Sequence, residues 1–283
     1  MSNNPSPQKS TDLHICAAAP GCQKKDPILV ADHIKKTFGG LTAVDVEHLE
    51  IPKNAITALI GPNGAGKTTF FNVLTGLYKP SAGKIVYGDK EITDLPPHKI
   101  AEIGIARTFQ NIRLFGLMTA QENLLVAMHS HLKAGITATI LRTPKQRKEE
   151  REAEEKAQEI LDFAGVGKWT HEFARNLSYG DQRRLEVARA LALNPKVLLL
   201  DEPTAGMNAQ ESQVFIDFIN KLVAERDIAV MLIEHDMKVV MALSQRITVL
   251  DQGEKIAEGS PDEIKNNPRV IEAYLGKPKG ARK

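Results

Sequence analysis

The sequence has few cysteines, few aromatic residues and no long apolar run. Two cysteines among 283 residues exclude a disulfide framework and indicate a reducing compartment. Aromatic residues make up 5% of the chain and the net charge is +2, so a basic, aromatic-rich nucleic-acid surface is not expected. No stretch approaches the roughly 18 consecutive apolar residues of a membrane-spanning helix. The hydrophobic content of 42% instead predicts a globular protein with a substantial core.

Residues 1–26 differ from the rest in being rich in Asn, Ser, Pro, Gln and Lys, which predicts a disordered extension. Their short apolar stretch does not match the central region of a secretory signal, so export is not expected. Cys16 could be a lipidation site, and Cys16 and Cys22 together could bind a metal. Two free thiols without a role are the simpler interpretation, because His14 is the only other potential metal ligand nearby. The folded domain is then expected to span residues 27–283.

The strongest motif fits the phosphate-binding pattern G-x-x-x-x-G-K-[ST]. Its residues are Gly61, Pro62, Asn63, Gly64, Ala65, Gly66, Lys67, Thr68 and Thr69. The apolar residues 56–60 before it predict a buried strand, and residues 69–74 predict a helix. Such a loop directs backbone N–H groups and a helix N-terminus at a phosphate. Lys67 is expected to reach the β- and γ-phosphates and Thr68 to hold Mg²⁺. A chance glycine-rich turn is the alternative, and the strand–loop–helix context argues against it.

Two further segments predict buried strands that end in ionisable residues. Residues 197–200 are four large apolar residues, which indicates burial on both faces of a parallel sheet, and Asp201 and Glu202 follow. Because successive side chains on a strand point in opposite directions, Asp201 is expected in the Mg²⁺ shell and Glu202 beside an attacking water. Residues 228–233 form a second such strand, which ends near His235. Ligands bind at this end of α/β sheets, although a structural histidine is the commoner case.

Other segments have the periodicity of regular secondary structure. Strands are predicted at residues 28–31, 41–51, 83–87, 105–109, 246–251 and 255–257. Helices are predicted at residues 119–129, at 144–164, from 177–182 onward and from Pro261. Where the third of these helices begins, Ser178 or Asp181 is expected to act as the N-cap and Gly180 to provide the turn.

In chain order, the phosphate loop, Gln110, residues 177–182, Asp201-Glu202, residues 205–208 and His235 resemble the motifs of the ATP-binding cassette of ABC transporters. The resemblance covers about residues 28–275. Two stretches, Phe38-Gly39-Gly40-Leu41 and residues 106–115, resemble more narrowly the ATPase subunits of branched-chain (hydrophobic) amino acid importers.

The resemblance implies a role for each matching residue. Phe38 would stack on adenine, and Gln110 would touch Mg²⁺ and sense the membrane partner. Asp201 would bind Mg²⁺ through water, Glu202 would polarise the hydrolytic water, and His235 would contact the γ-phosphate of ATP.

The segment at residues 177–182 resembles the family's signature, which acts on the nucleotide that a partner cassette holds. Ser178 and Gly180 match the usual Leu-Ser-Gly-Gly-Gln sequence, whereas Tyr179 and Asp181 depart from it. An acid near a γ-phosphate is mildly repulsive, so the contacts of Asp181 stay open.

The implied fold is α/β: a P-loop NTPase cassette with a parallel core sheet, an antiparallel N-terminal β subdomain and a helical subdomain at about residues 111–177. The implied cofactors are ATP and Mg²⁺. The implied partners are a second cassette, identical or homologous, in a head-to-tail dimer, two membrane permease subunits and an external substrate-binding protein. The cassette would lie peripherally on the cytoplasmic face of the inner membrane.

Three other functions fit part of the sequence. A P-loop kinase would share Lys67 and Asp201 but has no use for residues 177–180 or His235. A soluble ABC ATPase of repair or translation would keep the signature, but usually carries two cassettes or a long coiled coil. A cassette for another solute, such as a lipid, would keep every motif.

The apolar residues 114–118 directly after Gln110 predict a groove for a permease helix, because a methionine and an aromatic residue flank a glycine. Burial of Leu114 and Leu117 in the helical subdomain is the alternative.

Overall fold

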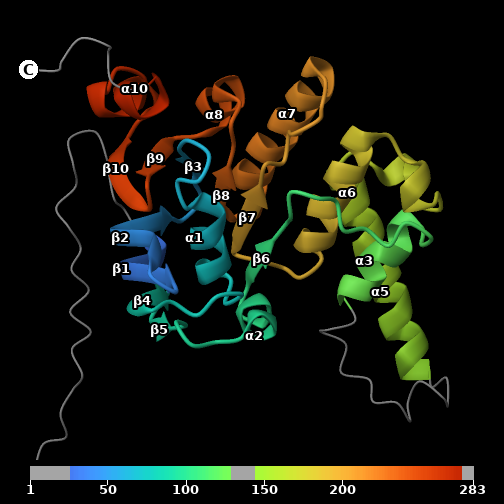
Figure 1. Ribbon diagram of the computed structural model, residues 1–283. Helices are drawn as coiled ribbons and strands as arrows, with labels where there is room; N and C mark the ends of the chain where they lie inside the picture. The colour runs from blue at the N-terminus through green and yellow to red at the C-terminus, as the bar shows by residue number, and fades with distance from the viewer. Residues whose placement is uncertain (1–25, 129–143, 276–283) are drawn as a thin grey trace, which may run out of the picture.

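The strands of the described residues form one sheet with two differently paired halves. The computed structural model describes residues 26–128 and 144–275. Its strand order is β5-β4-β1-β2-β10-β9-β3-β8-β7-β6 (Figure 1). In chain order the strands are β1 (Pro27–Phe38), β2 (Leu41–Pro52), β3 (Ile56–Ile60), β4 (Ala82–Tyr87), β5 (Lys90–Glu91), β6 (Ile105–Arg107), β7 (Val197–Asp201), β8 (Ala229–Ile233), β9 (Arg246–Asp251) and β10 (Glu254–Gly259).

The pairing changes direction at β10. Strands β9, β3, β8, β7 and β6 are parallel neighbours, and β5, β4, β1 and β2 are antiparallel neighbours. Strand β10 pairs antiparallel with β9 and touches β2 through one parallel pair, Glu254 with Asp45. The predicted parallel core sheet and antiparallel N-terminal part are confirmed.

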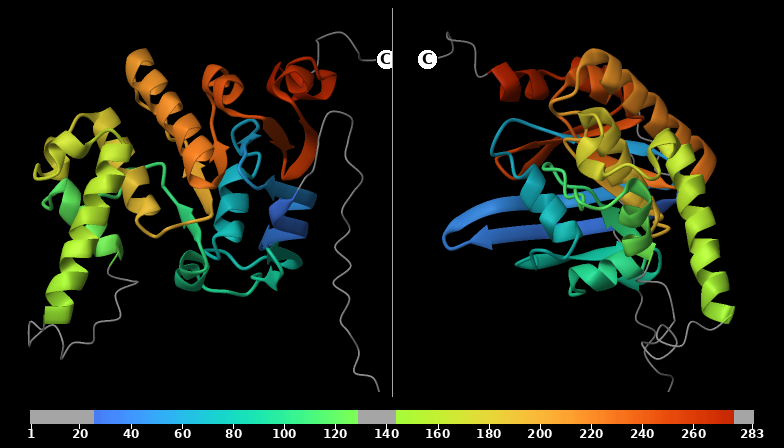
Figure 2. Two further views of the ribbon diagram at one scale, coloured as in Figure 1. Left: turned by 180° about the vertical axis from the view of Figure 1, so that it is seen from behind. Right: turned by 90° about the vertical axis from the view of Figure 1, so that its right-hand side faces the viewer.

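Helices surround the sheet. They are α1 (Lys67–Leu74), α2 (Pro97–Glu102), α3 (Ala120–Met128), α5 (Pro144–Phe163), α6 (Tyr179–Leu191), α7 (Ala209–Arg226), α8 (Met237–Leu243), α9 (Pro261–Lys265) and α10 (Pro268–Leu275). Two short 3₁₀ turns, η2 (Gly167–Trp169) and η3 (Ala174–Asn176), precede α6. Seen from behind and from the side, α5 and the β1–β2 hairpin lie at opposite sides of the molecule (Figure 2).

The three middle strands of the parallel half are buried on both faces, as their continuous apolar sequences predict. Every residue of β3, β7 and β8 is buried. Alternate side chains enter different cores: Leu198 and Leu200 of β7 face one cluster, and Leu199 faces the other. Because both faces are covered, the strand ends are left as the place where polar side chains can collect.

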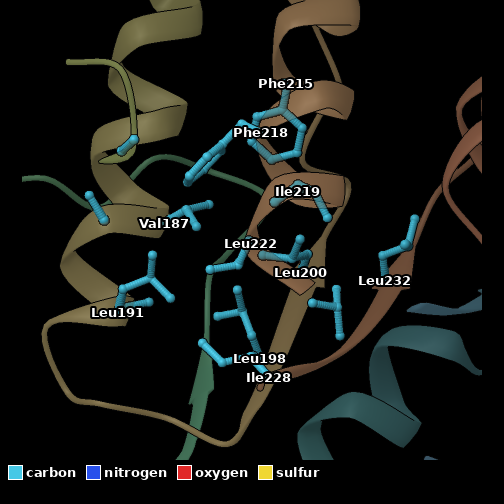
Figure 3. Packing of buried hydrophobic residues seen from close by; sticks show 14 of the residues in the cluster. Val187, Leu191, Leu198, Leu200, Phe215, Phe218, Ile219, Leu222, Ile228 and Leu232 are labelled. Carbon is cyan, nitrogen blue, oxygen red and sulfur yellow. The ribbon is translucent and has the colours of Figure 1, made fainter. Parts of the chain in front are cut away.

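One face of the sheet packs against α6, α7 and α8. Figure 3 shows Phe215 and Phe218 of α7 between the helix α6 and the strands, with Leu198 and Leu200 below them. The rings of Phe215 and Phe218 meet edge to face, with centroids 6.2 Å apart. Helix α7 begins at a capping box, in which the side chain of Asn208 accepts from the backbone of Glu211 and the reverse bond is also present.

The opposite face packs against α1. Phe70, Phe71 and Leu74 are fully buried there, together with apolar residues of β1 and β2. Helix α1 follows the phosphate loop directly, so this packing fixes the direction in which the loop enters the helix.

The segment predicted to form a helical subdomain contains α3, α5, η2 and η3. Leu124 of α3 and Leu161 of α5 belong to the same buried cluster as Leu185 of α6. The helices α3 and α5 thus reach the sheet through α6 (Figure 1).

Two strand predictions differ from the structure. Strand β1 continues to Phe38 through polar residues because it pairs with β2 over its whole length and with β4 as far as Lys35. Its buried Asp32 meets His48 at 2.5 Å. Strand β6 ends at Arg107, so Gln110 lies in a loop beyond the strand. The sequence analysis also left out β5, α2, α7, α8 and α10. The predicted N-terminal extension with Cys16 and Cys22 lies, apart from residue 26, outside the described residues.

We predict that Phe215→Ala lowers the free energy of unfolding by about 3–5 kcal/mol, the usual cost of removing a buried aromatic ring. The neighbouring Val214 is 42% exposed, so Val214→Ala is the matched control and should change stability little. Urea unfolding of the two variants measures the difference. Equal midpoints would show that the α6–α7 layer does not stabilise the sheet.

Candidate functional site

The phosphate loop lies in a space that only glycine fits. Gly61, Gly64 and Gly66 all have positive φ angles, of 152°, 80° and 94°. A Cβ atom on Gly61 would lie 2.1 Å from the carbonyl oxygen of Leu250, and one on Gly66 would lie 2.4 Å from that of Ala43. The positive φ angles favour glycine at all three positions, and the close approach of β9 and β2 also excludes a side chain at Gly61 and Gly66.

Lys67 fills the centre of this loop. Its Nζ atom donates to the carbonyl oxygens of Gly61 and Pro62, at 2.8 and 2.9 Å, and 6% of the residue is exposed. Burial lowers the pKa of Lys67, while the nearby carboxylates of Glu202 and Asp201 act in the opposite direction. The structure thus holds a cationic amine beside the loop amides, a combination that suits a phosphate.

A cavity of about 620 Å³ opens beside the loop. Residues 63–69, Glu202 and His235 line it, as do Leu41, Thr42, Ala43 and Gln252, which the sequence analysis did not select. Gln252 lies in the β9–β10 turn with a φ angle of 48°. The Asp-Gln-Gly sequence after an apolar strand was the available signal for that turn.

Asp201 and Glu202 have different partners. One oxygen of Asp201, Oδ2, accepts from Arg107 at 2.7 Å in an ion pair whose side chains are 5% and 6% exposed. Arg107 also donates to Asn72 of α1 at 2.7 Å and lies near the rings of Phe71 and Phe109. Asp201 is thereby fixed to α1 through Arg107.

At Glu202 the backbone turns away from the direction of strand β7. Its φ angle is 48°, a left-handed conformation that is costly for a residue with a side chain and typical of functional sites. The Oε1 atom lies 2.6 Å from Nε2 of His235, and Oε2 accepts from Nε2 of Gln110 at 2.9 Å. The different directions of Asp201 and Glu202 thus arise from a backbone turn as well as from strand alternation.

Glu234 holds this turn in place, and the sequence analysis did not assign it a role. The carboxylate is 3% exposed and accepts from the backbone and hydroxyl of Thr204, at 2.9 and 2.6 Å, and from the backbone of His235. It therefore ties the segment after β7 to the end of β8, which places Glu202 opposite His235.

Phe38 lies at the end of β1, outside the residues that line the cavity. Its ring is 44% exposed and meets Tyr78 edge to face, with centroids 5.3 Å apart. Lys36 lies 5.0 Å from the centre of the same ring. Stacking of this ring on adenine stays a prediction.

The signature residues 177–182 begin α6, away from the cavity of their own chain. Exposed Ser178 is the N-cap and accepts from the backbone of Asp181 at 3.2 Å. The acid of Asp181 pairs with Arg184 and accepts from the hydroxyl of Ser178 at 2.8 Å. The departure at Asp181 is therefore neutralised within the helix. Gly180 is not left-handed, and the expected role in a turn is wrong.

Gly180 instead allows α6 to approach α7. A Cβ atom there would lie 3.2 Å from the side chain of Glu211 in the capping box of α7. Tyr179 meets Arg183 at 3.0 Å, so both departures from the usual signature are matched by arginines on the same helix.

The structure thus brings together the phosphate loop, Gln110, Asp201, Glu202 and His235, and leaves Phe38 and the signature residues at other surfaces. The residues fit a nucleotide with Mg²⁺: loop amides and Lys67 face phosphate oxygens, and hydroxyl and carboxylate oxygens are ligands that Mg²⁺ prefers. Within residues 26–128 and 144–275, there is no cluster of three His, Cys, Asp or Glu side chains to hold a metal without such a phosphate ligand.

Comparison with known proteins gives the same result. The family model described as ABC transporter matches residues 44–205, and the model described as Branched-chain amino acid ATP-binding cassette transporter matches residues 254–279. The high-affinity branched-chain amino acid transport ATP-binding protein BraF of Pseudomonas aeruginosa is 48% identical over 250 residues, which are 88% of this chain and 98% of BraF.

Solved structures share the fold. The ADP conformation of MJ1267, an ATP-binding cassette of an ABC transporter, gives a TM-score of 0.77 at 32% identity, over 89% of this chain and all of that chain. The dimeric ABC transporter cassette MJ0796 gives a TM-score of 0.69 at 26% identity, over 82% of this chain and 98% of the other. The chain therefore belongs to the ABC transporter family, as an ATP-binding cassette that hydrolyses ATP.

Proposed function

We propose that this chain is the ATP-hydrolysing subunit of an importer for branched-chain or other hydrophobic amino acids. The identity of 48% to BraF over nearly the whole folded part is the observation that carries the proposal. The match of residues 254–279 to a branched-chain amino acid cassette model agrees with it.

In the proposed assembly, the chain pairs head to tail with a second cassette, identical or homologous. The dimeric structure of MJ0796 supports a pairing of cassettes. Two permease subunits carry the solute, and an external substrate-binding protein delivers it. None of the described helices combines the length and apolarity needed to cross a bilayer. We propose that the cassette lies on the cytoplasmic face of the inner membrane, attached through its permeases.

In the proposed mechanism, the loop amides and Lys67 bind the β- and γ-phosphates of ATP. Lys67 would then exchange its carbonyl partners, Gly61 and Pro62, for phosphate oxygens, whose negative charge offsets the cost of burying its ammonium group. Thr68 and Asp201 are proposed to hold Mg²⁺, which neutralises charge that develops on the phosphates. The ion pair with Arg107 keeps the carboxylate of Asp201 in one orientation.

Glu202 is the proposed residue that orients and polarises the attacking water. Its carboxylate is held at both oxygens, by His235 and by Gln110, and its left-handed backbone turns it toward the cavity that it lines. Phe38 is proposed to stack on adenine, and Ser178 and Gly180 to close over the nucleotide of the partner cassette.

We predict that Glu202→Gln retains ATP binding but lowers turnover by roughly 10²–10⁴-fold, which is the usual contribution of a general base to the rate. Binding persists because Lys67 and Asp201 are unchanged. The control is Glu225→Gln, an exposed acid near the end of α7. Phosphate release by the purified complex and nucleotide binding by calorimetry measure the two effects. Turnover of Glu202→Gln equal to that of the control would remove Glu202 from catalysis.

The surface next to Gln110 supports the proposed contact with the permease. We call Phe115, Leu117, Met118 and Phe173 the apolar patch; they are 46%, 73%, 37% and 43% exposed. Leu114 packs against the core, whereas Leu117 is the most exposed of the four, so the core alternative is wrong for Leu117.

The backbone of the apolar patch at Phe115 is held by hydrogen bonds to a buried side chain. Asn123 of α3 is fully buried, and its amide bonds both the N–H and the carbonyl of Phe115, at 2.9 and 3.1 Å. It also donates to the carbonyl of Thr119 at 2.9 Å. Three of the four apolar residues follow Gln110 by five to eight positions, and Asn123 fixes the backbone at Phe115, so the apolar patch suits a short permease helix.

We predict that Phe115→Glu leaves ATP hydrolysis by the isolated cassette unchanged but abolishes assembly with the permease subunits and solute uptake. A carboxylate in an apolar groove would be buried without a partner. Val126→Glu is the matched control, because Val126 of α3 is 43% exposed and lies outside the apolar patch. Pull-down of the permease and uptake of radiolabelled leucine measure the outcome. Full capture and uptake with Phe115→Glu would place the permease contact elsewhere.

A further inference from the structure

A buried arginine joins α6 to the loop that carries Gln110. Arg183 lies on the second turn of α6 and is 3% exposed. Its Nη1 atom donates to the carbonyl oxygen of Phe109 at 2.9 Å, and its Nη2 atom donates to the carbonyl oxygen of Gln110. The planar fork of a guanidinium suits two adjacent carbonyls in a way that a lysine ammonium cannot.

Two other residues of α6 also contact the side chain of Arg183. Nη1 lies 3.2 Å from Glu186, and Nη2 donates to the hydroxyl of Tyr179 at 3.0 Å. Glu186 also accepts from the backbone N–H of Arg113 at 3.3 Å. Burial raises the pKa of Glu186, and Arg183 opposes this effect. The segment from Phe109 to Arg113 is thus held to α6 at both ends.

On its other side, Gln110 reaches the catalytic carboxylate. Its amide donates to Oε2 of Glu202 at 2.9 Å, and Oε1 of Glu202 meets His235. A continuous series of contacts therefore runs from His235 and Glu202, through Gln110 and Arg183, to the N-terminal turn of α6.

The series ends at the surface where Ser178 is exposed. Tyr179 is one of the two departures from the usual signature, and its contact with Arg183 brings the signature into the series. A shift of the backbone at Gln110 would move two hydrogen bonds of Arg183 together.

We propose that Arg183 is a positioning residue that links the γ-phosphate side of one nucleotide site to the signature turn of α6. The inference rests on the proposed function, which places that turn on the nucleotide of the partner cassette. Gln110 follows the γ-phosphate of its own site, Arg183 carries the displacement to α6, and the two sites of the dimer hydrolyse ATP cooperatively.

The test uses the full chain and a mutant cycle of Arg183→Lys with Gln110→Ala. Arg183→Lys retains a cation for Glu186 but satisfies only one of the two carbonyls. We expect it to lower kcat by about tenfold, because one hydrogen bond to a charged group is lost. It should also lower the Hill coefficient for ATP. The dissociation constant for ADP should stay within about twofold of that of the wild type, because no loop contact changes.

If Arg183 acts through Gln110, substituting Arg183 should have no further effect once the side chain of Gln110 has been removed. The double variant should therefore match Gln110→Ala alone in kcat and Hill coefficient, whereas a purely structural role predicts that the two losses multiply. Arg189→Lys is the matched control, since Arg189 lies on the same helix and donates to the carbonyl of Arg113. It should leave kcat and cooperativity unchanged.

Circular dichroism first establishes that Arg183→Lys is folded. If it is not, Arg183→Met with Glu186→Gln removes both charges without leaving a buried carboxylate unpaired, and the same cycle is run with it. The link alone would be overturned if the losses in kcat of the two single variants multiply in the double variant. It would also be overturned if Arg189→Lys lowers kcat as much as Arg183→Lys does. A wild-type chain without cooperative ATP hydrolysis would overturn the head-to-tail dimer and the link together.

Discussion

The close approach of backbone to backbone around the phosphate loop is the constraint on which the rest of the site depends. The end of β9 and the start of β2 leave no room for a Cβ atom at Gly61 or Gly66. The backbone of the loop is therefore restricted to one conformation. The buried phenylalanines of α1 fix the direction of the helix that follows the loop. A nucleotide phosphate would meet an arrangement formed before it binds, so little of the binding free energy is spent on ordering the loop.

The remaining polar groups collect at one edge of the sheet because parallel strands end there together. Strands β7 and β8 bring Asp201, Glu202 and His235 to the same edge as the loop after β3, and β6 ends one strand further on. Each acidic side chain has a separate anchor: Arg107 for Asp201, and His235 with Gln110 for Glu202. Separate anchors allow one carboxylate to serve a metal while the other serves a water.

The sequence predicted those parts of the molecule whose cause is local. The phosphate loop, the buried strand before it, the helix after it, and an N-cap at Ser178 or Asp181 follow from patterns within about ten residues. The capping box of α7, Asn208 to Glu211, is also a local signal, which marks the start of a helix. By contrast, the partners of Arg107 and Arg183 lie 94 and 73 residues away, and no periodicity relates them. The left-handed Glu202 and the buried pair of Asp32 and His48 arise from tertiary contacts in the same way.

The rigid support beneath the apolar patch has a consequence for how such cassettes diverge. The side-chain amide of Asn123 bonds main-chain atoms of Phe115, so the exposed side chains at positions 115, 117 and 118 are not needed to hold this backbone. They can be exchanged in evolution without disturbing the cavity, because none of them lines it. One catalytic apparatus can therefore be matched to different membrane partners by substitutions at a few exposed positions, while the arginines behind them stay in place.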